Sequence, residues 1–161
     1  MRSVDKSKIR KKLKESDKYI KDFALELYDI SDNNSNNQDY IELDFNNVKG
    51  WFFNVAIIAK YVEQTLFKMG NHGVSQAEVF TTINGAGINA NKFIPIIKVN
   101  LTKDDKERLY KSHLSLVEGL TKIRKALVVF DGKKVSCDPC RLNEIGNICF
   151  QMTDDVFLAF S

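Results

Sequence analysis

The chain has 161 residues, of which 43% are hydrophobic and 28% charged, and its formal net charge is +3. This length suits one domain, and the composition excludes an intrinsically disordered chain. No apolar run reaches the about 18 residues that a membrane helix needs, the N-terminus is charged, and three cysteines do not suit a disulfide framework. We therefore expect a cytoplasmic or otherwise intracellular protein without a membrane partner.

The first predicted element is a helix from Lys6 to about Ile30. Its apolar residues recur at spacings that place them on one helical face. They are Ile9, Leu13, Ile20, Ala24 and Leu27. The polar run SDNNSNNQD predicts a loop after this helix. The next residues, YIELDF, predict either a short strand or an extended lead-in to the second helix.

Charge is unevenly distributed over this first part of the chain. Residues 1–22 carry nine cations against four carboxylates, a local net of +5, whereas residues 26–48 carry six carboxylates and no lysine or arginine. Such asymmetry favours a charged partner, and a basic helix can displace counterions from phosphates. The cations expected to contact nucleic acid are Lys6, Lys8, Arg10, Lys11, Lys12, Lys14 and Lys18.

Other interpretations of this basic segment stay open. It could be a solvated helix face or a frayed arm, or it could pair with the acidic segment of a neighbouring copy. In the sequence only Tyr19 supplies an aromatic ring nearby, so stacking on single strands is not indicated.

A second helix is predicted from a cap at Asn46 or Asn47 to about Met69. Its broad apolar stripe belongs at the centre of a core. The stripe comprises Phe52, Val55, Ile58, Val62, Thr65, Leu66 and Met69, widened by Phe53, Ala56 and Ala59. The sequence GNHG at 70–73 suits a helix C-terminus.

Residues 74–98 allow two interpretations. They could form a DNA-reading helix-turn-helix, with Gly85 and Gly87 in the turn. The side chains offered to base edges would be Asn89, Asn91 and Lys92. Alternatively, they form a structural turn between core elements. The turn is longer than usual and Pro95 interrupts the second helix, which favours the structural turn.

The clearest predicted helix covers 103–127. Thr102 can cap it, with Asp105 at the third helical position, and its charges complement the helix dipole. Its apolar stripe steps by four and three residues. The members of the stripe are Leu109, His113, Leu116, Leu120, Ile123 and Leu127.

Arg108 and His113 in this helix are separated by four residues, in RLYKSH. The spacing resembles the catalytic signature of the HEPN ribonuclease superfamily, whose helical domains pair so that the Arg and His of two copies meet over RNA. The resemblance implies that His113 is an acid or base and that Arg108 clamps a phosphate. The family usually has a polar residue directly after the arginine, where this chain has Leu109. Because His113 falls on the apolar stripe, a core histidine is the competing interpretation.

The tail is predicted to be rich in β-structure. ALVVF-DGKK-VSC predicts a hairpin, and ICFQM-TDD-VFLAF predicts another. Cys137 and Cys140 form a CxxC pair, with Cys149 nine residues on. A zinc site would need a fourth ligand, and neither histidine has suitable spacing, so a tight turn closed by Pro139 is the simpler interpretation. No cofactor motif is present.

These observations predict an α+β fold, with a mainly helical body of about four helices and a small C-terminal antiparallel β element. We expect a single domain over 1–161, comprising a basic N-terminal helix or arm at 1–30, a helical core at 46–127 and a β-rich tail at 128–161. The function expected first is a non-enzymatic regulatory or accessory protein that contacts nucleic acid. The alternatives are a protein-interaction module, such as an oligomer, small effector or inhibitor, and a HEPN-like ribonuclease.

Overall fold

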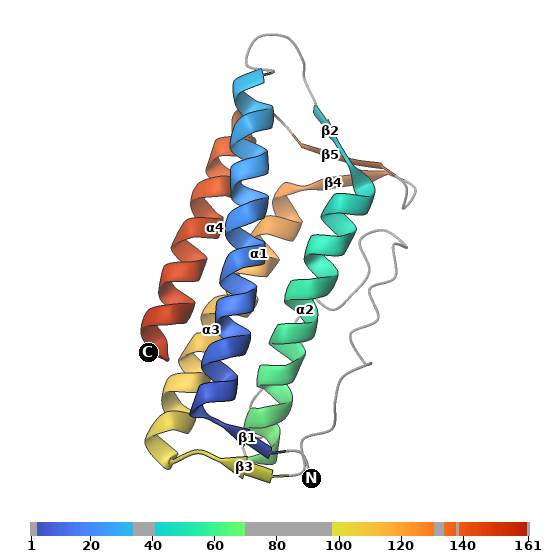
Figure 1. Ribbon diagram of the computed structural model, residues 1–161. Helices are drawn as coiled ribbons and strands as arrows, with labels where there is room; N and C mark the ends of the chain where they lie inside the picture. The colour runs from blue at the N-terminus through green and yellow to red at the C-terminus, as the bar shows by residue number, and fades with distance from the viewer. Residues whose placement is uncertain (1–2, 34–40, 70–97, 131–133, 138, 161) are drawn as a thin grey trace.

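Four helices dominate the computed structural model, which describes residues 3–33, 41–69, 98–130, 134–137 and 139–160 (Figure 1). The helices are α1 (Lys6–Asn33), α2 (Phe45–Lys68), α3 (Lys103–Ala126) and α4 (Pro139–Ala159). Successive helices run in opposite directions, so α1 and α3 are antiparallel to α2 and α4 (Figure 1). Each of α1 and α3 packs against both α2 and α4. The predicted helical body is therefore confirmed.

Short strands join the ends of the helices. β1 (Ser3–Asp5) pairs in parallel with β3 (Lys98–Asn100), in the register Val4 opposite Val99. At the other end of the bundle, β5 (Lys134–Cys137) lies between β2 (Ile41–Leu43) and β4 (Val128–Phe130) in an antiparallel sheet. YIELDF thus contains a short strand, one of its two predicted interpretations.

The prediction of a β-rich C-terminus is wrong. Residues 139–159 form α4, and the expected hairpin from ICFQM to VFLAF does not exist. Pro139 begins this helix, a position that needs no backbone N–H, rather than closing a turn. The strands β4 and β5 that precede α4 do pair as an antiparallel hairpin.

The spacing of buried side chains explains why this segment is helical. They recur every three or four residues and therefore lie on one face, which packs against α1 and α3. They are Leu142, Ile145, Cys149, Met152, Val156 and Phe160.

The apolar stripes predicted for the other helices are largely confirmed. All five stripe residues of α1 and all six of α3 are buried, including His113. The stripe of α2 has two exceptions, because Phe53 is 37% exposed and Met69 is half-buried and lies just beyond the end of the helix. None of the described helices has a stretch long and apolar enough to cross a bilayer.

Of the two predicted helix caps, one is confirmed and one is wrong. Thr102 caps α3 as predicted: its Oγ1 accepts from the Asp105 N–H at 3.1 Å, and Asp105 Oδ2 accepts from the Thr102 N–H at 3.1 Å. The predicted cap of α2 is wrong, because Asp44 occupies that position. Its Oδ1 accepts from the N–H groups of Asn46 and Asn47.

Asp105 also fixes the start of α1. Its Oδ1 lies 2.9 Å from Lys6 Nζ and 2.8 Å from an Arg108 guanidinium nitrogen, and the carboxylate is buried. Burial opposes ionisation of this group, but hydrogen bonds from Lys6 and Thr102 outweigh it and lower the pKa of Asp105 to about 2. Together with the β1–β3 pairing, this cluster holds the basic end of α1 against α3.

Candidate nucleic-acid interface

The basic N-terminal segment is a core helix of the bundle, and its cations fall into two groups. In the first group, charges are already satisfied inside the protein. Lys6 pairs with Asp105, Lys12 Nζ lies 3.6 Å from Glu15 Oε2, and Lys8 Nζ donates to the Ser3 carbonyl at 2.7 Å. Lys12 also lies 5.6 Å from the centroid of the Tyr61 ring on α2. These three lysines are therefore weaker candidates for contacts with phosphates than the sequence suggested.

The second group comprises Arg10, Lys11, Lys14 and Lys18, which we call the cationic face. All four side chains are exposed. Their charged groups have no ion-pair partner among the described residues. Because each residue turns an α-helix by about 100°, these positions fall within an arc of about 100°, over a length of about 12 Å. The cationic face therefore presents four charges in one direction from a fixed helix.

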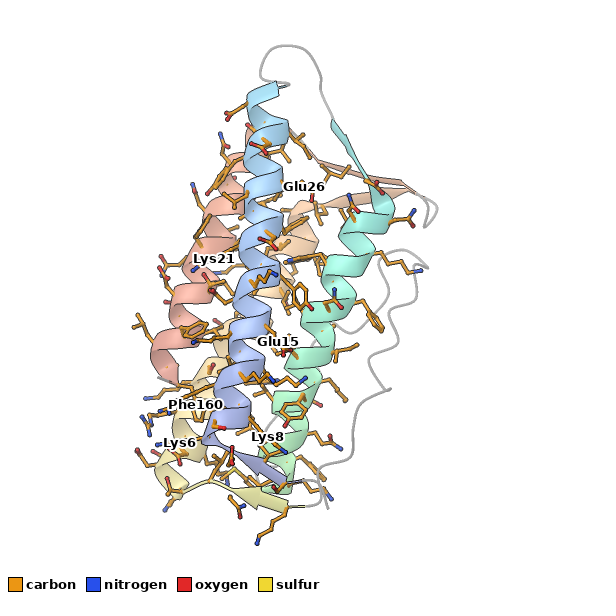
Figure 2. All side chains as sticks on the ribbon, viewed as in Figure 1. Lys6, Lys8, Glu15, Lys21, Glu26 and Phe160 are labelled. Carbon is orange, nitrogen blue, oxygen red and sulfur yellow. The ribbon has the colours of Figure 1, made fainter. Side chains whose placement is uncertain are left out.

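A hollow of about 580 Å³ adjoins the cationic face, where the first half of α1 meets the end of α4. Arg10, Lys11 and Lys14 line it from α1. Phe157 and Phe160 line it from α4, and Figure 2 shows Phe160 on the side of α1 that faces α4. Phe157 is half-buried, whereas Phe160 is buried. Cations and aromatic rings thus meet around one hollow, which we call the α1–α4 hollow.

A second hollow between α1 and α4, farther along α1, has a different charge. It is lined by Lys14 and Lys21 but also by Asp17 and Asp154. Lys21 Nζ lies 3.3 Å from Asp17 Oδ2, so its charge is compensated locally. Of these two hollows between α1 and α4, only the α1–α4 hollow, with the adjoining cationic face, is electropositive.

The second half of α1 has an acidic flank on the side that faces α2. Asp22 and Glu26 line a hollow of about 360 Å³ between α1 and α2, together with side chains that include Trp51. Figure 2 shows Glu15 and Glu26 on the side of α1 that faces α2, and Lys21 on the side that faces α4. The side of α1 that faces α2 also carries Lys8 and Lys12 nearer the start of the helix. Asp22 and Glu26 therefore lie farther along α1 than most of the cationic face.

Arg108 and His113, the pair that resembles the HEPN signature, each have other neighbours within the bundle. The bundle is helical, as the resemblance implies, but His113 is only 4% exposed and faces Glu63 of α2, with Nε2 and Oε2 4.0 Å apart. Burial lowers the pKa of His113 to about 4. Arg108 instead pairs with Asp105 and Asp104 at the start of α3. The core-histidine interpretation therefore agrees better with this geometry.

The three cysteines lie on two elements. Cys137 ends β5, and Cys140 and Cys149 lie on α4, where nine residues correspond to a rise of about 13 Å. Cys149 is buried, and burial raises its pKa to about 12. Among the described residues, no group of three or more His, Cys, Asp or Glu side chains could hold a metal ion.

The candidate helix-turn-helix over 74–98 lies outside the described residues up to position 97. Asn89, Asn91 and Lys92 belong to that part, so their contacts with base edges stay a prediction.

The aromatic contribution to the site was missed from the sequence. Tyr19 was the sole ring found near the basic segment, yet Phe157 and Phe160 adjoin it in the folded chain. Both lie in the segment that was predicted to be a strand. The helical spacing of apolar residues through 142–160 is the signal in the sequence that indicates a helix here.

Comparison of the chain with protein-family models, with curated proteins and with solved structures found no match in any of the three.

Proposed function

We propose that the chain is a non-enzymatic accessory protein that holds nucleic acid by its phosphate backbone, on the cationic face of α1. The observation that carries this proposal is the exposure of Arg10, Lys11, Lys14 and Lys18 along one side of a packed helix, without carboxylate partners among the described residues. Their span of about 12 Å corresponds to the rise of three or four nucleotides along a duplex axis, at about 3.4 Å each.

The surroundings of the cationic face support the same proposal. Because α1 is held by α2 and α4, and its start by Asp105, the backbone that carries the four cations is already ordered before a ligand binds. Pre-organisation of this kind lowers the entropic cost of association. The carboxylates of the acidic flank, Asp22 and Glu26, lie between α1 and α2 and disfavour a phosphate backbone there.

A protein partner is the alternative, but the described residues form no single apolar surface that favours it. The large apolar side chains that are exposed in the described part of the chain are spread over all four helices. They are Leu25, Phe53, Phe67, Leu114 and Leu158. A ribonuclease is disfavoured by the burial of His113, which keeps its ring away from a substrate.

The decisive experiment measures oligonucleotide binding as a function of salt. Four phosphate contacts give a slope of log affinity against log salt of about −3 for single strands and about −4 for duplex DNA. Arg10→Gln with Lys14→Gln should reduce the magnitude of this slope by about 1.5 and weaken binding at every salt concentration.

The matched control removes the same two charges from α3, by Lys111→Gln with Lys122→Gln, both exposed. Its salt slope should stay close to that of the wild type. Equal losses in the two variants would show that net charge alone attracts the nucleic acid. Such a result, or no binding at about 50 mM salt, would refute the proposal.

A further inference from the structure

The α1–α4 hollow has a composition that phosphate binding alone does not explain. Its volume of about 580 Å³ lies within the range of about 300–1,000 Å³ that is typical of small-ligand sites. Leu13, Phe157 and Phe160 give it an apolar floor, and the three cations of α1 stand along one wall. A phosphate backbone lying on the cationic face would leave this apolar floor unoccupied.

The charge of the lining selects the type of group that enters. The side chains that line the α1–α4 hollow include three cations and no carboxylate. The next hollow includes Asp17 and Asp154, and the hollow between α1 and α2 includes Asp22 and Glu26. Of these three hollows, the α1–α4 hollow is therefore the one that suits a flat apolar ring attached to an anionic backbone.

A nucleobase has this chemistry. Every base presents a π-face that can stack on an aromatic ring, at about 1–3 kcal/mol per base, while its phosphate stays within reach of lysine or arginine. In a duplex the bases are stacked and paired, and taking one out costs a few kcal/mol. Phe157 is the half-buried ring of the lining and the one open to a ligand, whereas Phe160 is 3% exposed.

We propose that the α1–α4 hollow receives one unstacked base of a single-stranded nucleic acid, with its phosphates on Arg10, Lys11 and Lys14. This inference rests on the proposed function and narrows it to single strands over duplexes. Because the floor is apolar and offers few polar groups, the preference among the four bases is weak.

The test compares three probes of equal length at one salt concentration: a single-stranded oligonucleotide, its duplex, and the same strand with abasic sites throughout. Fluorescence anisotropy gives the affinity of each. The intact single strand should bind about tenfold more tightly than the abasic strand, because only the intact strand can fill the hollow. The duplex should bind more weakly than the intact single strand.

The diagnostic variant is Phe157→Leu, which keeps an apolar side chain but removes the ring. It should lower the affinity for the intact strand about tenfold, to the level of the abasic strand, and leave binding of the abasic strand unchanged. The control is Phe150→Leu on the same helix. Phe150 is also half-buried, but its ring stacks with Tyr28 at a centroid distance of 6.1 Å, away from the hollow. Thermal unfolding verifies that both variants are folded.

The outcomes separate this inference from the proposed function. Equal affinity for intact and abasic strands, or for single strand and duplex, would overturn base insertion but leave phosphate binding standing. Absence of binding to all three probes would overturn both. Polyglutamate binding as tightly as the intact strand would also overturn base insertion, because it would indicate an acidic protein segment as the occupant.

Discussion

Asp105 concentrates three interactions in one buried carboxylate, so its protonation should be visible in the stability of the protein. Hydrogen bonds lower its pKa to about 2, below the unfolded value near 3.8. The stabilisation is therefore complete above about pH 4 and is lost as pH falls towards 2. Asp105→Asn should lower the free energy of unfolding at pH 7 by about 2 kcal/mol and flatten this acid limb in denaturant titrations.

Asp104→Asn is the matched control for this change. Asp104 also pairs with Arg108, but its side chain is 76% exposed. Its replacement should change the free energy of unfolding by less than about 1 kcal/mol. Similar losses in the two variants would contradict the role assigned to the buried group.

His113 should act in a separate pH range. Burial lowers its pKa to about 4, so the unfolded chain, with a value near 6.5, binds the proton more readily. Stability is complete above about pH 6.5 and declines as pH falls towards 4, by about 3 kcal/mol, because the buried imidazole resists protonation. His113→Gln should remove this decline while retaining the loss below pH 4 that is due to Asp105. An unchanged profile between pH 6.5 and 4 would show that other groups cause it.

At the scale of the elements, glycines mark where helices approach closely. A Cβ on Gly146 of α4 would meet the ring of Tyr28 on α1. Gly146→Ala should therefore destabilise the protein by about 1–2 kcal/mol, despite the better helix propensity of alanine. The control is Gly50→Ala on α2, where a Cβ meets no other atom within 4 Å. It should stabilise the protein by about 0.5–1 kcal/mol in thermal or chemical unfolding. Effects of the same sign at both positions would contradict this packing.

The element that was misjudged from the sequence shows how local signals mislead. ICFQM and VFLAF are short and rich in aromatic and β-branched residues, which favours strands, and TDD resembles a turn. The buried residues from Leu142 to Phe160 recur with a helical period. A helix is favoured because it buries this apolar face against α1 and α3. The helices with longer regular stripes, α1 and α3, were predictable because period and propensity agree there.

The candidate site was predictable in part, because composition is visible in the sequence whereas contacts between distant residues are not. The sequence contains the excess of cations before residue 22, but it does not show which of them meet a carboxylate. Lys6 is neutralised by Asp105, ninety-nine positions away, and Phe157 reaches the basic segment only through the packing of α4 on α1. Both contacts join residues that are far apart in the sequence, so no local sequence pattern predicts them.

At the scale of the whole molecule, the two flanks of α1 should influence a bound polyanion together. Asp22 and Glu26 lie one or two turns from Lys18, close enough to repel phosphates at low salt. Asp22→Asn with Glu26→Gln should raise oligonucleotide affinity a few-fold at about 50 mM salt, and the gain should fade by about 300 mM as screening increases. The control is Glu107→Gln with Glu118→Gln, two exposed positions on α3. An equal gain from the control would assign the effect to net charge.

Because Cys149 is deeply buried, the reactivity of its thiol can report how often the bundle opens. Alkylating reagents attack the thiolate, and a pKa of about 12 leaves almost none of it in the folded protein. With Cys137 and Cys140 replaced by serine, maleimide should label Cys149 only in molecules whose fourth helix has come away. The labelling rate would then measure how often α4, which carries Phe157, separates from α1, which carries the cations.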